Sequence, residues 1–314
     1  MSGSVLYAGP ARGWPEWGQA LADALRGEGL DLRVTDSAPD PGAVRYVAYA
    51  PGGLIEDFTP FTGLQAILSL WAGVERVLAN PTLPRGVPLA RMVDEGLRAG
   101  MIEWVCAHVL RHHLGTDTHV LGQDGRWRSD PPPPLAQMRD VGVLGMGELG
   151  AATAKALVAL GFPVTGWSRR PRQVPGVTGL SGPEGLVETL RRARILVCLL
   201  PETPATRDLL NAERLALLPR GAVVINPGRG TLIDEAALLS ALDRGHLGHA
   251  TLDVFRTEPL PPDHAFWAHP RVTVTPHVAA ATRPETAAVA VAANIARAEA
   301  GLPLRHVVDR DAGY

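Results

Sequence analysis

Cysteine, lysine and long hydrophobic runs are all scarce in this sequence of 314 residues. Its two cysteines, Cys106 and Cys198, lie in apolar segments without a partner at metal-ligand or redox spacing, which predicts buried thiols and excludes a disulfide-built scaffold. The longest uncharged stretch, 58–74, is interrupted by proline and polar residues, and the N-terminus lacks a basic segment followed by an apolar run. We therefore expect a cytoplasmic protein without a membrane span.

An excess of charge of one sign is also missing. The formal net charge is −2 and the pI is about 6.6, so nothing in the overall charge attracts nucleic acid or an anionic membrane. The chain is long enough for about two domains, and its hydrophobic content of 46% is that of an ordinary globular protein. We expect a small-molecule partner.

Short β-rich segments alternate with helical patterns along nearly the whole chain, which predicts an α/β fold with parallel sheets. The first third contains a predicted helix over 14–29 and predicted strands at 4–9, 30–35, 44–50 and 65–75. A long helical pattern over 97–113 leads to a proline-rich connector ending at 131–134. From residue 140 the pattern restarts, with strand segments at 162–168, 193–201, 221–228, 249–255 and 272–278 and a last helix over 284–301.

A G-x-G-x-x-G motif is formed by Gly145, Gly147 and Gly150 directly after an apolar strand, and it opens a helical segment. This context predicts a dinucleotide-binding turn, because the pattern needs a tight turn, close backbone approach to pyrophosphate and close packing of helix on strand. A glycine-rich turn without a ligand is the structural alternative.

The next strand ends in Trp167, Ser168, Arg169 and Arg170 instead of the Asp or Glu that holds the ribose 2′-hydroxyl of NAD. A hydroxyl and two guanidiniums can pair with a 2′-phosphate, so the sequence favours NADP over NAD. The alternative is that both arginines are solvated loop charges.

Three ionisable residues follow later strands, where an open parallel sheet binds its ligands. They are Arg229, Glu258 and His277, at spacings of 29 and 19 residues, which is about one βα unit each. Reduction of a 2-oxo acid needs a cation for the carboxylate, a proton donor for the carbonyl oxygen and a group that keeps the donor charged. Arg229, His277 and Glu258 can supply these in turn, although each residue taken alone is typical of a structural role.

The motifs together resemble the D-isomer-specific 2-hydroxyacid dehydrogenase family, and most closely its glyoxylate/hydroxypyruvate reductase A group. The resemblance covers roughly residues 60–314 and rests on G-x-G-x-x-G, LLPETPAT (199–206), INPGRG (225–230), LDVFRTEPLP (252–261), TPHVAA (275–280) and the ending HVVDRDAGY.

By this resemblance Arg229 binds the substrate, Glu258 orients the histidine and His277 is the acid/base. The resemblance further implies that the loop Trp71-Ala72-Gly73 holds the substrate carboxylate through its amides, and that Asp253 contacts the nicotinamide amide. Tyr49, at the end of a predicted strand in the first lobe, is expected on the substrate side because of that position. The remaining cofactor-binding positions are Met146, Glu148, Leu149, Leu200, Pro201, Thr206, Asn226, Pro227, Gly228, His277 and Ala279.

The family architecture implies two lobes, in which a Rossmann-like domain over 99–282 binds NAD(P) and is inserted in a flavodoxin-like substrate domain over 1–98 and 283–314. It also implies a homodimer paired through the nucleotide lobe. The activity implied is NADPH-dependent reduction of glyoxylate or hydroxypyruvate to glycolate or D-glycerate.

Two alternatives remain open on the sequence. One is a non-catalytic dinucleotide sensor or corepressor on the same fold, and the other is an NAD-dependent dehydrogenase of another 2-hydroxy acid. No set of histidines lies at workable metal-ligand spacing, so no metal is expected.

Overall fold

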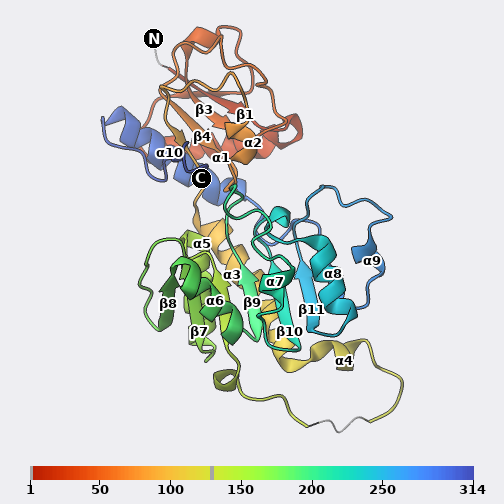
Figure 1. The fold of residues 1–314 in the computed structure, drawn as a ribbon. Helices are drawn as coiled ribbons and strands as arrows, with labels where there is room; N and C mark the ends of the chain where they lie inside the picture. The colour runs from red at the N-terminus through yellow and green to blue at the C-terminus, as the bar shows by residue number, and fades with distance from the viewer. Residues whose placement is uncertain (1–2, 128–130) are drawn as a thin grey trace. The chain divides into compact units, whose positions relative to one another are not determined.

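The computed structural model describes residues 3–127 and 131–314, and the chain divides into two compact units. Unit 1 consists of Met1–Leu97 and Ala281–Tyr314, and unit 2 of Arg98–Ala280. The chain thus leaves unit 1 once, builds unit 2 and returns (Figure 1). These boundaries lie one and two residues from the predicted ones at 98/99 and 282/283.

Unit 1 is built on a five-stranded parallel sheet. Its strands are ordered β2-β1-β3-β4-β5, the order of a flavodoxin-like fold. Their bounds are β1 Ser4–Ala8, β2 Arg33–Thr35, β3 Val44–Tyr49, β4 Ala66–Ser69 and β5 Leu89–Ala90. The strand predicted over 65–75 is shorter than expected, because β4 stops at Ser69 and a short helix, α2 (Glu75–Leu78), follows.

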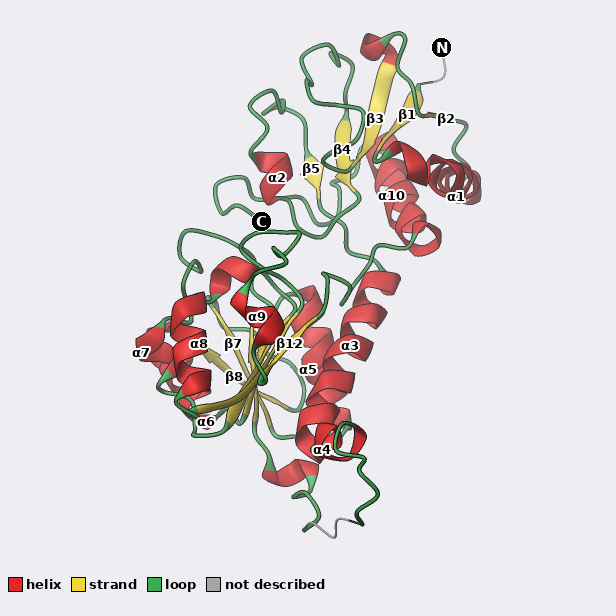
Figure 2. Cartoon of the chain, turned by 90° about the vertical axis from the view of Figure 1, so that its right-hand side faces the viewer, coloured by secondary structure: helices red, strands yellow, loops and turns green. Residues whose placement is uncertain are grey.

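The returning C-terminal segment completes unit 1. Helix α10 (Pro284–Glu299) packs against α1 (Trp14–Gly27), and the alanines on its buried face allow the two helices to approach closely (Figure 2). Thr286 Oγ1 donates to the Asp94 carboxylate, and Val307 forms an antiparallel bridge with Ala90. Two 3₁₀ turns complete the connections: η1 (Ala11–Gly13) lies between β1 and α1, and η2 (Pro41–Ala43) lies between β2 and β3.

Unit 2 is built on a seven-stranded parallel sheet with the order β12-β11-β10-β9-β6-β7-β8. The first strand, β6, lies between β7 and β9, so the topological switch point at which Rossmann folds bind dinucleotides falls at the end of β6. The predicted α/β class is therefore confirmed. The strands are β6 Val141–Leu144, β7 Val164–Ser168, β8 Val177–Ser181, β9 Ile195–Cys198, β10 Ala222–Asn226, β11 Leu247–Leu252 and β12 Val272–Val274.

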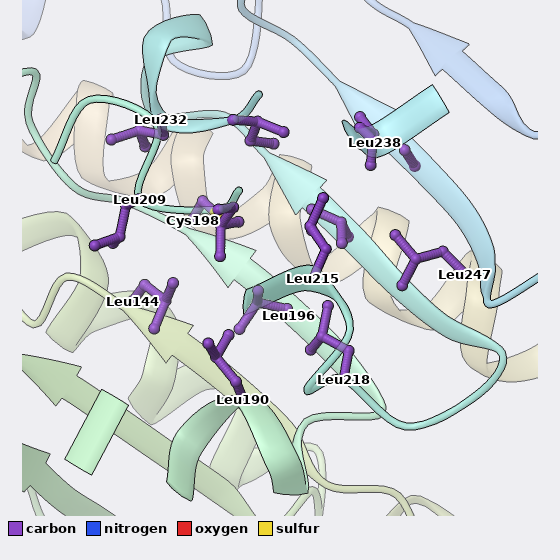
Figure 3. Packing of buried hydrophobic residues seen from close by; sticks show 14 of the residues in the cluster. Leu144, Leu190, Leu196, Cys198, Leu209, Leu215, Leu218, Leu232, Leu238 and Leu247 are labelled. Atoms are coloured by element: carbon purple, nitrogen blue, oxygen red, sulfur yellow. The ribbon is translucent and has the colours of Figure 1, made fainter. Parts of the chain in front are cut away.

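Helices cover both faces of this sheet, as a parallel sheet requires. Leu144 and Leu196 point into an apolar cluster under α6, α7 and α8 (Figure 3), whereas their neighbours Val143 and Val197 point into a second cluster under α3 and α5. Bounds are α3 Glu95–Leu114, α4 Thr116–Val120, α5 Glu148–Ala159, α6 Gly182–Arg192, α7 Ala212–Leu215, α8 Glu235–Asp243, α9 Ala265–Ala268, η3 Ala136–Met138 and η4 Gly230–Leu232.

The two cysteines are free thiols. Cys198 lies fully inside the first cluster, where burial raises its pKa to about 12. Cys106 on α3 is half-buried, less than predicted, and burial raises its pKa as well. Neither thiol is in the ionised form that reacts or binds metal at neutral pH.

Candidate active site

The loop after β6 shows which glycines the protein's own packing requires. Gly145 has a φ of +100°, and a Cβ added to it would lie 2.4 Å from the carbonyl oxygen of Leu199. A Cβ on Gly150 would lie 1.7 Å from the carbonyl oxygen of Gly145. At Gly147, by contrast, no atom of the described residues other than Gly147 and its two chain neighbours lies within 4 Å of the Cβ position. The backbone at Gly147 therefore faces open space.

A dinucleotide fits this loop. Helix α5 begins at Glu148, and its first intrahelical hydrogen bond runs from the Ala151 amide to Gly147 O at 2.9 Å. The amides before Ala151 therefore lie at the positive end of the helix, which is suited to a pyrophosphate. Met146 is buried against Gly166 and Leu149 is half-buried, so these two side chains pack within unit 2.

A cluster of arginines follows β7. Ser168 is half-buried and its Oγ donates to Arg170 O at 2.7 Å, while the side chains of Arg169 and Arg170 are exposed. Trp167 is buried, with Nε1 donating to Gly182 O at 2.8 Å. The sequence interpretation missed Arg172, which pairs with Glu148 of the glycine loop at 3.0 Å. That contact joins the arginine segment to the N-terminus of α5.

Two polar residues, one in the segment after β9 and one at the end of β10, hold their own loops. Thr206 Oγ1 donates to Pro201 O at 2.7 Å and accepts from the Thr203 amide at 2.8 Å. The buried Asn226 donates through Nδ2 to Arg229 O at 2.9 Å and accepts from the Gly228 amide at 3.1 Å. Both side chains thus shape the loops in which the predicted cofactor-wall residues lie, among them Leu200, Pro201, Pro227 and Gly228.

The three candidate catalytic residues come from loops after β10, β11 and β12. His277 Nδ1 and Glu258 Oε2 are 2.8 Å apart, and Glu258 Oε1 accepts from the Phe255 amide at 2.9 Å. A Cβ on Gly230 would lie 2.0 Å from the carbonyl carbon of Phe255, so the loop that carries Arg229 packs directly on the loop that leads to Glu258. Unit 2 therefore brings the three loops together at one edge of its sheet.

The charges of this cluster act on one another. The hydrogen bond with Glu258 is the main cause that raises the pKa of His277, and the negative charges of Glu258 and Asp253 raise it further. Burial of the imidazole and the positive charge of Arg229 lower this pKa. Burial alone would raise the pKa of Glu258. The pKa nevertheless lies below its ordinary value, because His277 and the Phe255 amide donate hydrogen bonds to the carboxylate and the charges of His277 and Arg229 stabilise it. The imidazolium and the carboxylate stabilise each other's charged forms.

Asp253 is completely buried, and its carboxylate accepts hydrogen bonds only from the segment around His277 among the contacts of the described residues. The donors are Thr275 Oγ1 at 2.6 Å, the Val278 amide at 2.9 Å and the Ala279 amide at 2.9 Å. The sequence interpretation did not identify Thr275. Ala279 is buried, and its methyl group lies in the cluster under α3 and α5.

The residues predicted for the substrate side lie in unit 1. Trp71 is 36% exposed at the end of β4, where its amide donates to Ser69 Oγ at 3.2 Å, and Ala72 and Gly73 are half-buried in the same loop. Tyr49, in contrast, is 4% exposed and packs edge-on against Phe58 in the core of unit 1. Because strand β3 is buried on both faces, Tyr49 belongs to that core, and we remove it from the candidate site.

The nucleotide-binding arrangement of unit 2 is that of a dinucleotide-dependent oxidoreductase, and sequence comparison identifies which kind. Residues 104–279 match the family described as D-isomer specific 2-hydroxyacid dehydrogenase, NAD binding domain. A protein of Serratia proteamaculans named glyoxylate/hydroxypyruvate reductase A is 45% identical over 80% of this chain and 82% of its own length. One of the same name from Photorhabdus laumondii is 42% identical over 99% of both chains. The chain belongs to the D-isomer specific 2-hydroxyacid dehydrogenase family, a family of oxidoreductases, which confirms the predicted family.

Solved structures of the family are similar over the whole chain. A D-isomer specific 2-hydroxyacid dehydrogenase of Xanthobacter autotrophicus in complex with NADPH and MES is 41% identical, with a TM-score of 0.91 and all of both chains covered. An NADPH-dependent glyoxylate/hydroxypyruvate reductase of Sinorhizobium meliloti in complex with NADP and sulfate is 38% identical, with a TM-score of 0.88 and the same coverage.

Neither a metal centre nor a membrane span was found in the described part of the chain. Residues 3–127 and 131–314 contain no group of three His, Cys, Asp or Glu side chains that could hold a metal ion. No helix within the same residues is long and apolar enough to cross a bilayer.

Proposed function

We propose that the protein is an NADPH-dependent reductase of small 2-oxo acids, converting glyoxylate to glycolate and hydroxypyruvate to D-glycerate. The observation that carries the proposal is the 2.8 Å contact between His277 Nδ1 and Glu258 Oε2 at the strand ends of a dinucleotide-binding unit. This contact leaves Nε2 of the imidazole as the nitrogen that can face a substrate, and it favours the protonated form of the ring by raising its pKa.

The residues of unit 2 have complementary roles in this reaction. The reduced nicotinamide, when bound, supplies hydride to the carbonyl carbon. His277 donates its Nε2 proton to the carbonyl oxygen as negative charge develops there, and Glu258 stabilises the imidazolium before the transfer. Arg229 binds the substrate carboxylate through its guanidinium. The family resemblance assigns Asp253 to the nicotinamide amide; in this structure its carboxylate is completely buried, and its Oδ2 accepts only the Ala279 amide among the described contacts.

The arginine segment supports NADPH as the cofactor. Ser168 is the last residue of β7, and Arg169 and Arg170 follow it, where the family places the adenosine ribose. The two guanidiniums provide donors where an NAD enzyme needs an acceptor. The two solved relatives described above contain NADPH or NADP, which agrees with this assignment. In the proposal, the open space at Gly147 takes the pyrophosphate.

The two units have separate roles in the proposal. Unit 2 binds the cofactor and carries the proton donor, whereas the Trp71-Ala72-Gly73 loop of unit 1 binds the substrate carboxylate through its amides. This second assignment rests on the family resemblance. Leu70 O, at the start of that loop, accepts from Thr282 Oγ1 at 2.9 Å, so the loop is tied to the chain that returns from unit 2.

We also propose that two copies pair through unit 2. Its described residues in 114–127 and 131–138 expose a concentration of large apolar side chains, which is typical of an interaction surface. They are Leu114, Val120, Leu121, Trp127, Leu135 and Met138. Light scattering during gel filtration is expected to give twice the chain mass of 33.3 kDa, and the variant Leu121→Glu is expected to lower it. A monomeric wild type would contradict the proposal.

The catalytic proposal is tested by replacing His277 with asparagine. The backbone at His277 has a φ of +54°, a conformation that asparagine tolerates better than most residues, so the loop is expected to keep its shape. Turnover of glyoxylate should fall about 100-fold or more, because general acid catalysis is lost, while NADPH binding stays near that of the wild type. The exposed His119→Asn serves as the matched control.

The outcomes separate the alternatives. A fully active His277→Asn would exclude this residue as the proton donor. A wild-type protein that binds NADPH without reducing any small 2-oxo acid would instead favour a dinucleotide sensor.

A further inference from the structure

Asp253 accepts hydrogen bonds from one short segment only among the contacts of the described residues. Its donors lie 22, 25 and 26 residues further along the chain, at Thr275, Val278 and Ala279. The two amides belong to the backbone and remain in almost any variant. The Thr275 hydroxyl, 2.6 Å from Oδ1, is the donor that a single substitution can remove.

His277 lies in the middle of this segment in a left-handed conformation. Its φ is +54°, which is unfavourable for a residue with a Cβ and persists only where the surroundings hold it. The His277 amide donates to Asp253 O at 2.8 Å and to Thr275 O at 3.0 Å. Asp253 therefore holds the segment in two ways. Its backbone oxygen accepts from the His277 amide, and its carboxylate accepts from residues on both sides of His277.

We propose that Thr275 is a positioning residue for His277, acting through its hydrogen bond to the buried Asp253 carboxylate. The inference rests on the proposed function, since it assumes that His277 is the proton donor. In this proposal Thr275 contacts neither the substrate nor the cofactor. Its hydroxyl fixes the start of the segment, so that the imidazole meets Glu258 at hydrogen-bond distance. The charged groups that act on the imidazole are Glu258, Asp253 and Arg229.

Removing the hydroxyl has a defined consequence. Valine has nearly the shape of threonine, so Thr275→Val leaves the volume filled while Oδ1 of Asp253 retains only the Val278 amide among the described donors. The segment can then relax from the left-handed conformation, which lengthens the contact between His277 and Glu258. The pKa of His277 falls toward its ordinary value because that contact is the main cause of its rise.

Strand β12 supplies a matched control two residues away. Thr273 is half-buried like Thr275, and its Oγ1 lies 2.9 Å from His249 Nε2, so Thr273→Val also deletes one hydroxyl and one hydrogen bond. Thr275→Ser restores the hydroxyl without the methyl group. The three variants differ in whether the Asp253 carboxylate keeps its side-chain donor.

The experiment measures three quantities for each variant: kcat with NADPH and glyoxylate, the dissociation constant of NADPH, and the pKa of His277 by NMR titration of the ligand-free protein. The His277 signal is assigned by its loss in His277→Asn. Thr275→Val should lower kcat about 10-fold or more, as expected when a catalytic group is misplaced by a fraction of an ångström to 1 Å. It should lower the His277 pKa and leave NADPH binding unchanged. Thr275→Ser and Thr273→Val should match the wild type.

Unchanged kcat and His277 pKa in Thr275→Val would overturn the proposal. So would equal losses of kcat in Thr275→Val and Thr273→Val, because that result indicates a general structural effect. The NMR titration requires no turnover. A wild type that reduces no 2-oxo acid would therefore refute the proposed function, while the titration would still decide whether Thr275 positions His277.

Discussion

Replacing Gly147 by alanine is expected to weaken dinucleotide binding without unfolding the protein, whereas Gly150→Ala is expected to disrupt the loop itself. At Gly147 the φ of −70° and ψ of −162° suit alanine, and no described atom lies within 4 Å of the added Cβ. The free energy of unfolding should therefore change by less than about 1 kcal/mol. If the backbone there contacts the pyrophosphate, the methyl group should raise the Kd of NADPH about 10-fold or more, equivalent to about 1.4 kcal/mol.

At Gly150 the added Cβ lies 1.7 Å from Gly145 O, far inside the 3.0 Å below which something must shift. The backbone of Gly150 fixes the position of the added Cβ, and the oxygen belongs to the backbone of Gly145, so relief requires movement of the turn or of α5. Overpacking of this kind costs about 1–3 kcal/mol and sometimes more. Urea unfolding would measure stability and calorimetric titration would measure NADPH binding. Wild-type affinity in Gly147→Ala would refute the placement of the pyrophosphate, and wild-type stability in Gly150→Ala would refute the packing argument.

Three other predictions concern charge and packing. The pKa of His277 is raised in the folded protein, so the rate of reduction should persist at low pH and decline as the pH rises through that pKa. In Glu258→Gln this decline should move to lower pH. A pH profile of kcat that does not move would contradict the pairing of His277 with Glu258. The double substitution Ser168→Asp with Arg169→Ala should raise kcat/KM with NADH relative to kcat/KM with NADPH, because a carboxylate repels the 2′-phosphate. An unchanged ratio of the two kcat/KM values would argue against a 2′-phosphate site at these residues. Leu238→Ala, at a fully buried position under the seven-stranded sheet, should lower the free energy of unfolding by about 2–5 kcal/mol, and a loss below 1 kcal/mol in urea would count against this core.

The elements with strong local patterns could be predicted from the sequence. The strand, glycine turn and helix over 141–159 were placed correctly because apolar residues and glycines alternate there in a pattern with few alternatives. Strand β5 was not predicted, since its two residues, Leu89 and Ala90, carry no periodicity. Strand β4 was predicted too long because the apolar residues continue past Ser69 into the loop around Trp71.

The pairing of His277 with Glu258 was predicted because both residues lie in recognisable motifs, whereas side-chain contacts outside the motifs were not predicted. The pair of Glu148 with Arg172 joins residues 24 apart on different elements, and neither residue alone indicates the other. Asp253 was assigned by resemblance to a cofactor contact, while its donors in the folded chain come from the loop after the neighbouring strand. The burial of Tyr49 comes from an apolar cluster of unit 1 to which the loop after β3 contributes Ile55 and Phe58. The apolar residues of a fully buried strand do not reveal which loop residues will cover it.

The central claim is tested most directly by initial rates of cofactor oxidation on the purified protein, with NADPH and NADH in parallel and glyoxylate, hydroxypyruvate and pyruvate as substrates. We expect rapid NADPH oxidation with glyoxylate or hydroxypyruvate. With NADH, kcat/KM should be lower by about 10-fold or more, because a charge-assisted contact to the 2′-phosphate is lost. Faster turnover with NADH, or no turnover with any of the three acids despite NADPH binding, would contradict the central claim.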